Sequence, residues 1–406
     1  MSTFDMFIAL DGHGLNGFEG FAGVARLRAD TERDHYDVRV KFFDGIAGGH
    51  ATQINPQGTL AYLGNLSQTL LLYDPRTLEE VARLSTLRFA APDVVYSSQT
   101  HVAWLGERTF VTVIGPDFYR FEVDDLENPT RLGPHCVTLP HALKRSPSGR
   151  YLFYGAMDHD KKGYANQVGI YDLETDQARV VALPATAWHL GLHPSKDIFY
   201  APTQRCSPQG DMEFAEYTMA HYKNYLFEID GPSAKVLRHA AIPKDLPGFL
   251  TSDVIVTDDE VLYNCCASSV IARIDLATLS HVRYIDERVG ALSSMRYLRS
   301  GLSNLAESLS RVNLPDALHT FAKSLRITRG SLLDGSYGLQ LSPDKTRLLS
   351  AHRGRNQVIV YSYPDCRVLR RVDFPPLRRF FPEHLGLLDD TRLGFHHSAM
   401  SCATVA

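Results

Sequence analysis

Five histidines occupy the same place in a repeated sequence pattern. Each one precedes a short turn and then a second run rich in β-branched and aromatic residues. These histidines are His50, His101, His141, His189 and His384. Imidazole is the commonest protein ligand for transition metals, so a fold that brings these side chains to one point would build a metal site.

The segment that begins at His141 shows the repeat most clearly. Alternating apolar residues predict four short strands over residues 141–145, 150–155, 167–172 and 178–183, separated by turns rich in Pro, Gly, Asp and Ser. Hairpins of the first two strands recur near all five histidines and also near Asp253 and Tyr337. A repeat of this kind predicts one continuous domain over residues 1–406.

The number of hairpins predicts how the repeats close. Seven hairpins of the first kind are visible, the last over residues 385–397, but only six of the second kind follow His50. The missing pair is supplied near the N-terminus by residues 21–28 and 36–43. The sequence therefore predicts an all-β fold, a seven-bladed β-propeller closed by strands from both ends of the chain.

The turns carry a family resemblance. Tyr-Asp-Pro-Arg-Thr-Leu from Tyr73, Tyr-Asp-Leu-Glu-Thr from Tyr171 and Ile-Asp-Leu-Ala-Thr-Leu from Ile274 connect the outer strands, and Ser-Pro-Ser-Gly and Ser-Pro-Asp-Lys connect the inner ones. In these features the chain resembles the YVTN and WD40-like group of seven-bladed propellers over nearly its whole length. The resemblance implies the fold and leaves the function open, because that group includes enzymes, electron-transfer modules and scaffolds.

Residues 289–325 break the repeat. Apolar residues there keep a helical spacing, which predicts two amphipathic helices inserted between the fifth and sixth blades. The insertion would serve as a packing cap, a dimer contact or a lid over one mouth of the channel, with a membrane-surface helix as a further alternative.

The start of the innermost strand of a propeller blade lies at one mouth of the central channel. The five histidines should therefore ring that mouth, with Asp253 and Tyr337 at the two remaining positions. His352, His396 and His397, at the expected ends of second strands, should lie nearby. The long connections 156–166 and 203–223 should build the walls.

A set of imidazoles with few thiolates favours Fe(II), with Zn, Cu and Mn as alternatives. In architecture alone, the histidines resemble the four-histidine iron site of the carotenoid and stilbene cleavage oxygenases. That resemblance implies a mononuclear non-heme iron oxygenase, an oxidoreductase that acts on dioxygen and a small organic substrate. Asp253, Tyr337 and His352 are then candidates for orienting the substrate or moving protons.

Three alternatives remain open. WD40 blades often place a Gly-His pair before the innermost strand for structural hydrogen bonds, and Gly49-His50 matches that pair, whereas the other four histidines follow Thr, Pro, Trp and Glu. A metal-dependent lactonase-like hydrolase or lyase would use the ion as a Lewis acid. A non-enzymatic scaffold would bind no metal.

Composition excludes other classes. A formal charge of −4 without a basic stripe gives no support for nucleic-acid binding, and the longest apolar runs are too short for a transmembrane segment. No P-loop and no nucleophile elbow are present. Six cysteines without CxxC spacing, and an N-terminus unlike a signal peptide, predict free thiols and a cytoplasmic location.

Overall fold

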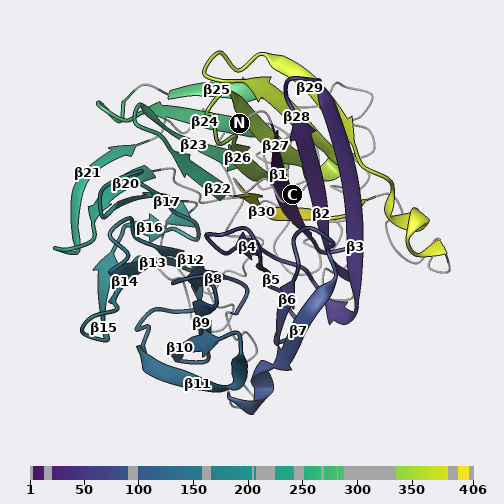
Figure 1. Ribbon diagram of the computed structural model, residues 1–406. Coiled ribbons are helices and arrows are strands. Elements are labelled where there is room, and N and C mark those ends of the chain that lie inside the picture. The colour runs from purple at the N-terminus through teal and green to yellow at the C-terminus, as the bar shows by residue number, and fades with distance from the viewer. Residues whose placement is uncertain are drawn as a thin grey trace, which may run out of the picture.

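The computed structural model describes residues 3–12, 21–89, 99–157, 166–203, 205–206, 225–241, 251–266, 269–280, 282–287, 335–382 and 392–401. Within these ranges the chain forms seven four-stranded sheets, which we call blades. Figure 1 shows them arranged around a central axis, with one edge strand of each blade facing that axis. The predicted all-β, seven-bladed propeller is confirmed.

The blades follow the chain, and the strands of each blade are named from the innermost to the outermost. Blade one holds β4 (Thr52–Ile54), β5 (Ala61–Leu63), β6 (Thr69–Tyr73) and β7 (Glu80–Ser85); blade two holds β8 (Val102–Trp104), β9 (Thr109–Ile114), β10 (Asp117–Glu122) and β11 (Asp125–Pro134). Blade three holds β12 (Pro140–Arg145), β13 (Tyr151–Ala156), β14 (Gln167–Asp172) and β15 (Gln177–Ala182); blade four holds β17 (Gly191–Leu192), β18 (Ile198–Pro202), β20 (Tyr225–Asp230) and β21 (Lys235–Ala241). Blade five holds β22 (Thr251–Val256), β23 (Glu260–Cys265), β24 (Val270–Asp275) and β25 (Val282–Asp286); blade six holds β26 (Ser336–Leu341), β27 (Arg347–His352), β28 (Gln357–Ser362) and β29 (Val368–Asp373). Blade seven holds β30 (Phe395–Ser401), β1 (Thr3–Leu10), β2 (Phe21–Asp30) and β3 (His35–Ala47), and a separate two-stranded ribbon pairs β16 (Ala185–Thr186) with β19 (Arg205–Cys206).

Apolar side chains fill the spaces between blades. Each of the seven core clusters draws its residues from two neighbouring blades; Tyr62 of blade one, for example, packs with Phe110 and Phe121 of blade two. Two of these clusters join blade seven to blade six and to blade one. Neighbouring blades therefore cover both faces of the inner strands. This explains why many inner strands are buried along their length.

Blade seven closes the ring with strands from both ends of the chain, as predicted, but in different proportions. The expected division was two strands from each end. Instead β1, β2 and β3 come from the N-terminal side, and β30 alone comes from the C-terminal side. β30 pairs with β1 as the innermost strand. The second strand predicted at the end of the hairpin 385–397 is therefore wrong, because Phe395 begins the innermost strand instead.

The predicted helical insertion at 289–325 lies outside the described residues and stays a prediction, as do most of the long connections 156–166 and 203–223. In the described ranges, helical structure is limited to three 3-10 turns, η1 (Thr86–Arg88), η2 (Arg353–Arg355) and η3 (Leu377–Arg379).

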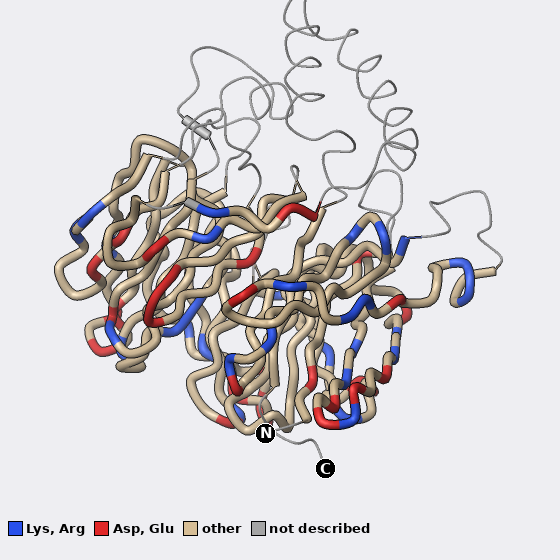
Figure 2. Tube along the Cα trace, turned by 90° about the horizontal axis from the view of Figure 1, so that it is seen from above, with Lys and Arg blue, Asp and Glu red and all other residues tan. Residues whose placement is uncertain are grey.

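Charged residues of both signs are interspersed over the blades (Figure 2), in keeping with the weak net charge. None of the helices in the described ranges has the length and apolar character needed to cross a membrane.

Candidate metal centre

Four of the predicted histidines lie at the start of innermost strands in four consecutive blades. His50 and His189 stand two residues before β4 and β17, His101 stands directly before β8, and His141 is the second residue of β12. The strand starts converge because every blade presents the same edge to the axis. Residues at equivalent positions of the sequence repeat therefore lie close together around the axis.

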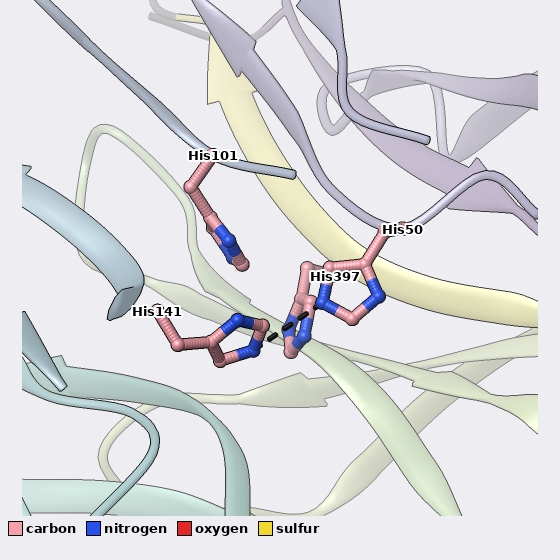
Figure 3. A group of neighbouring side chains, drawn as sticks. All are labelled: His50, His101, His141 and His397. Carbon is pink, nitrogen blue, oxygen red and sulfur yellow. Dashed lines mark hydrogen bonds between the residues drawn. The ribbon is translucent and has the colours of Figure 1, made fainter. Parts of the chain in front are cut away.

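A group of four histidines forms the centre of this arrangement. His50, His101, His141 and His397 each offer one ring nitrogen such that all four atoms lie within 4.8 Å of one another. The Nε2 atoms of His50 and His141 are 3.3 Å apart. Figure 3 shows the rings entering from different strands and pointing toward one another.

His397 was not among the predicted ligands. It was expected at the end of a second strand, but it lies in the innermost strand β30. His384, the predicted ligand of this blade, lies outside the described residues. The backbone N–H of His397 donates to the carbonyl of His50 at 3.2 Å, so the last blade meets the first at the site itself.

The spacing of the four rings fits a single metal ion. A metal–nitrogen bond of about 2.0–2.1 Å puts each ring centre about 3.2 Å from the ion, so ring centres lie about 4.5 Å apart at right angles and about 5.2 Å apart in a tetrahedron. The closest pair, His101 and His141, has centres 4.4 Å apart, and the widest, His141 and His397, has centres 6.0 Å apart. The other four pairs fall between 4.9 and 5.4 Å.

Two more histidines border this group. The ring centre of His189 is 4.4 Å from that of His397 and 4.7 Å from that of His141. The ring centre of His396 is 4.4 Å from that of His50, and its buried Nδ1 has no hydrogen-bond partner among the described residues. Six imidazoles thus share one buried region, which is more than tetrahedral binding of one ion requires.

Burial favours the neutral form of five of these imidazoles. It lowers the pKa of five of the six, His50, His101, His141, His189 and His396, well below 6.5, and the neighbouring rings lower it further. A neutral imidazole retains the electron pair that a metal ion binds. The protein therefore holds these five rings in the state needed for coordination.

Asp253 takes a supporting position. Its Oδ1 lies 3.2 Å from Nδ1 of His397, while its Oδ2 accepts hydrogen bonds from the N–H and Oγ of Ser398 and from the N–H of Leu339. A carboxylate on Nδ1 leaves Nε2 of the same ring as the atom available to a metal. His101 has a comparable contact, with its Nδ1 3.1 Å from Oγ1 of Thr100.

β-Bulges aim these side chains. In blade seven, the two residues His396 and His397 oppose the single residue Ala9, and the inner strands of blades three, five and six also shift register near their starts. In blade five, Oδ1 of Asn264 accepts the two N–H groups that the bulge releases, those of Ser252 and Asp253. A bulge changes the direction of a side chain, so that it can point toward the histidine group where the regular alternation of a strand would point it away.

Glycines let neighbouring blades approach closely at the same level. A Cβ atom on Gly64, just after β5, would lie 1.9 Å from the carbonyl oxygen of Thr100, the residue before His101. A Cβ on Gly155 would lie 2.1 Å from the carbonyl oxygen of Trp188, the residue before His189. In each case, one blade sets the backbone position of the next blade's histidine.

A cavity of about 430 Å³ follows the propeller axis beside the histidines. His101, His189 and His397 line it, together with Asp253 and residues further along the inner strands. Its walls include apolar side chains such as Trp104 and Leu190, which suit the body of a small organic molecule.

The remaining candidates are less central. Tyr337 is buried, with its ring centre 4.9 Å from that of His396, and the Arg353 guanidinium lies 5.2 Å from the centre of its ring. His352 ends β27 and is buried; burial lowers its pKa to about 3. Neither residue is among those that line the cavity.

No protein-family model matches the chain, and no curated protein matches it in sequence. Solved structures do share its fold. Kuenenia stuttgartiensis hydrazine synthase has a TM-score of 0.53 and 12% identity, covering 82% of this chain and 91% of its own. The dihydro-heme d1 dehydrogenase NirN has a TM-score of 0.50 and 13% identity, covering 90% and 72%.

A Bacteroides fragilis protein described as a candidate 6-phosphogluconolactonase has a TM-score of 0.57 and 10% identity, covering 98% of each chain. At such low identity these likenesses extend to architecture alone. The chain has the fold of a seven-bladed β-propeller.

Proposed function

We propose that this protein is a metal-dependent oxidoreductase, specifically a mononuclear non-heme iron oxygenase that acts on a small organic substrate. The observation that carries the proposal is the group formed by His50, His101, His141 and His397, whose donor atoms lie within 4.8 Å of one another. His189 is proposed as a further ligand or as a substrate contact. The proposal treats the whole chain as one domain in the cytoplasm.

The donor set supports iron. All four donors are imidazole nitrogens, and a sulfur ligand, which would favour Cu(I), is absent from this group. Zn, Cu and Mn remain the alternatives. An ion held by four imidazoles keeps its full charge, and Fe(II) with these ligands has coordination positions left for dioxygen and substrate.

The chain's own residues would prepare the site in three ways. Asp253 orients His397 through its Nδ1 and strengthens that ring as a donor. The cavity would hold the substrate beside His101, His189 and His397. Tyr337, next to His396, is the candidate for moving a proton, and His352 would act from a greater distance.

Enzymes are found among the structural neighbours, which supports an enzymatic role for this fold without selecting a reaction. The lactonase-like alternative has a structural neighbour in its favour. Among the described residues lining the cavity, however, Asp253 is the sole carboxylate, and its oxygens already accept bonds from His397, Ser398 and Leu339. The donor set therefore favours the oxygenase.

Elemental analysis tests the proposal. Protein purified without added metal or chelator should contain about one iron per chain and consume dioxygen in the presence of substrate. Zinc at the same stoichiometry would move the assignment to the hydrolase or lyase. A metal-free protein that takes up none on incubation would exclude a metal-dependent enzyme and leave the scaffold.

A further inference from the structure

The cavity beside the histidines contains a lysine side chain whose ammonium group makes no hydrogen bond or ion pair with the described residues. Lys144, Arg145 and Asp253 are the charged residues among the described ones that line it. Arg145 is engaged, because its guanidinium donates to the carbonyl oxygens of Gly149 and Leu105 at 3.0 and 2.7 Å. Asp253 is engaged with His397, Ser398 and Leu339. That leaves Lys144.

Lys144 faces the channel because of a bulge. It lies three residues after His141, and side chains three apart on a regular strand point to opposite faces. The register of β12 on β13 shifts between His141 and Lys144, and Ala142 within that shift has φ of 54°. Both side chains can therefore face the axis, about 10 Å apart or less along the strand.

The surroundings of Lys144 offer few groups that could balance its positive charge. Among the described residues, no hydrogen bond or ion pair reaches its ammonium group, and burial lowers its pKa despite the opposing effect of Asp253. Lys144 and His189 line the same cavity. Burial and the neighbouring histidines lower the pKa of His189, and the charge of Lys144 adds to this effect. Lys144 is half-buried, and an ammonium group partly removed from water gains from a ligand that supplies the opposite charge.

A second polar group also lacks a partner. Oε1 of Gln53 is buried without a hydrogen bond among the described residues, and Gln53 lines the same cavity. Nearby, Nε2 of Gln340 donates to the carbonyl oxygen of Ser398 at 2.8 Å. Gln53 is thus an acceptor available to a ligand, while Gln340 is committed to the protein.

We infer that the cavity takes a monocarboxylate, with its carboxylate on Lys144, its apolar body against the cavity walls and a donor group near Gln53. One lysine balances one negative charge, whereas a phosphate generally requires several donors or an arginine fork. This inference rests on the proposed function for the identity of the site and adds the class of substrate. A bound metal ion would add further positive charge and favour the same class.

The experiment is calorimetric titration of the full chain with benzoate, phenylacetate and octanoate, each compared with its neutral primary amide. At least one carboxylate should bind, and its amide should bind at least about tenfold more weakly. Lys144→Met should weaken carboxylate binding by about tenfold or more, and Lys144→Arg should restore part of it. Lys196→Met, an exposed lysine of blade four, is the matched control and should bind like the unaltered protein.

The inference is overturned if no carboxylate of this set binds, if the amides bind as tightly, or if Lys144→Met leaves the affinity unchanged while remaining folded. Should Lys144→Met fail to fold, Lys144→Gln replaces it with the same expectations. Metal content is measured on every variant, which separates the two proposals. If Lys144→Met contains metal and binds the carboxylate as tightly as the unaltered protein, only the present inference is wrong. If the unaltered protein contains no metal but loses carboxylate binding when Lys144 is replaced, only the metal proposal is wrong.

Discussion

Oδ1 of Asp253, on blade five, lies 3.2 Å from Nδ1 of His397, on blade seven. The contact passes across the inner strand of blade six, where the same carboxylate accepts the N–H of Leu339. One side chain thereby connects three blades at the level of the histidines. Under the proposed function, its removal should weaken metal binding more than it destabilises the fold.

Asp253→Asn should weaken metal binding by about 10–100-fold, since a carboxylate partner of a ligating histidine contributes on that scale. Competition with a chromophoric chelator measures the change. Asp258→Asn, an exposed position on the same blade, is the control and should leave the affinity unchanged. Equal affinity in all three proteins would show that Asp253 does not support a ligand.

His141→Ala should abolish stoichiometric metal, because His141 is the ring closest to His101 and its Nε2 contacts that of His50. Atomic emission on dialysed protein measures the metal content. His35→Ala, at an exposed position in β3, should retain full occupancy. Full occupancy in His141→Ala would remove this residue from the ligand set.

Acid should destabilise the metal-free protein. Burial lowers the pKa of His50, His101, His141, His189 and His396 well below 6.5, so below pH 6.5 the unfolded chain binds more protons than the folded one. The free energy of unfolding then falls as pH falls, by up to about 1.4 kcal/mol per pH unit for each such histidine.

Urea denaturation between pH 7.5 and 5.5 measures this slope. His189→Gln should make it shallower, while His35→Gln should not change it. A slope that is flat in the unaltered protein would show that these rings can take up protons at little cost, which contradicts their burial.

Gly64→Ala should destabilise the protein by about 1–3 kcal/mol and also weaken metal binding, because the new Cβ would press on the backbone before His101. Gly106→Ala is the matched control, since a Cβ there meets nothing within 4 Å. Thermal unfolding and chelator competition provide the two measurements. If stability falls without any effect on metal affinity, the contact does not position His101.

The architecture was predictable because each blade repeats the same local signals. Turns and alternation sufficed to count seven blades and to place His50, His101, His141 and His189 on one ring. The seventh position could not be assigned in the same way, since β30 pairs with β1 from the far end of the chain and has no hairpin partner next to it. His384-Leu-Gly-Leu repeats the residues of His189-Leu-Gly-Leu, so the sequence pattern favoured His384 over His397 as the ligand of this blade.

Lys144 was missed for a different reason. Strand alternation puts it on the face opposite His141, and only the register shift brings both toward the axis. Bulges depend on how two strands meet, so a single sequence does not reveal them. A pair of adjacent histidines in a strand-like run, such as His396-His397, was the signal available for the site in blade seven.

The composition of blade seven determines when the four histidines can come together. A ribosome makes His50, His101 and His141 long before His397, and only β30 brings that last ring to the others. An incomplete nascent chain would therefore lack the full coordination set. Under the proposed function, the chain could therefore bind a metal ion with all four histidines only after β30 has paired with β1.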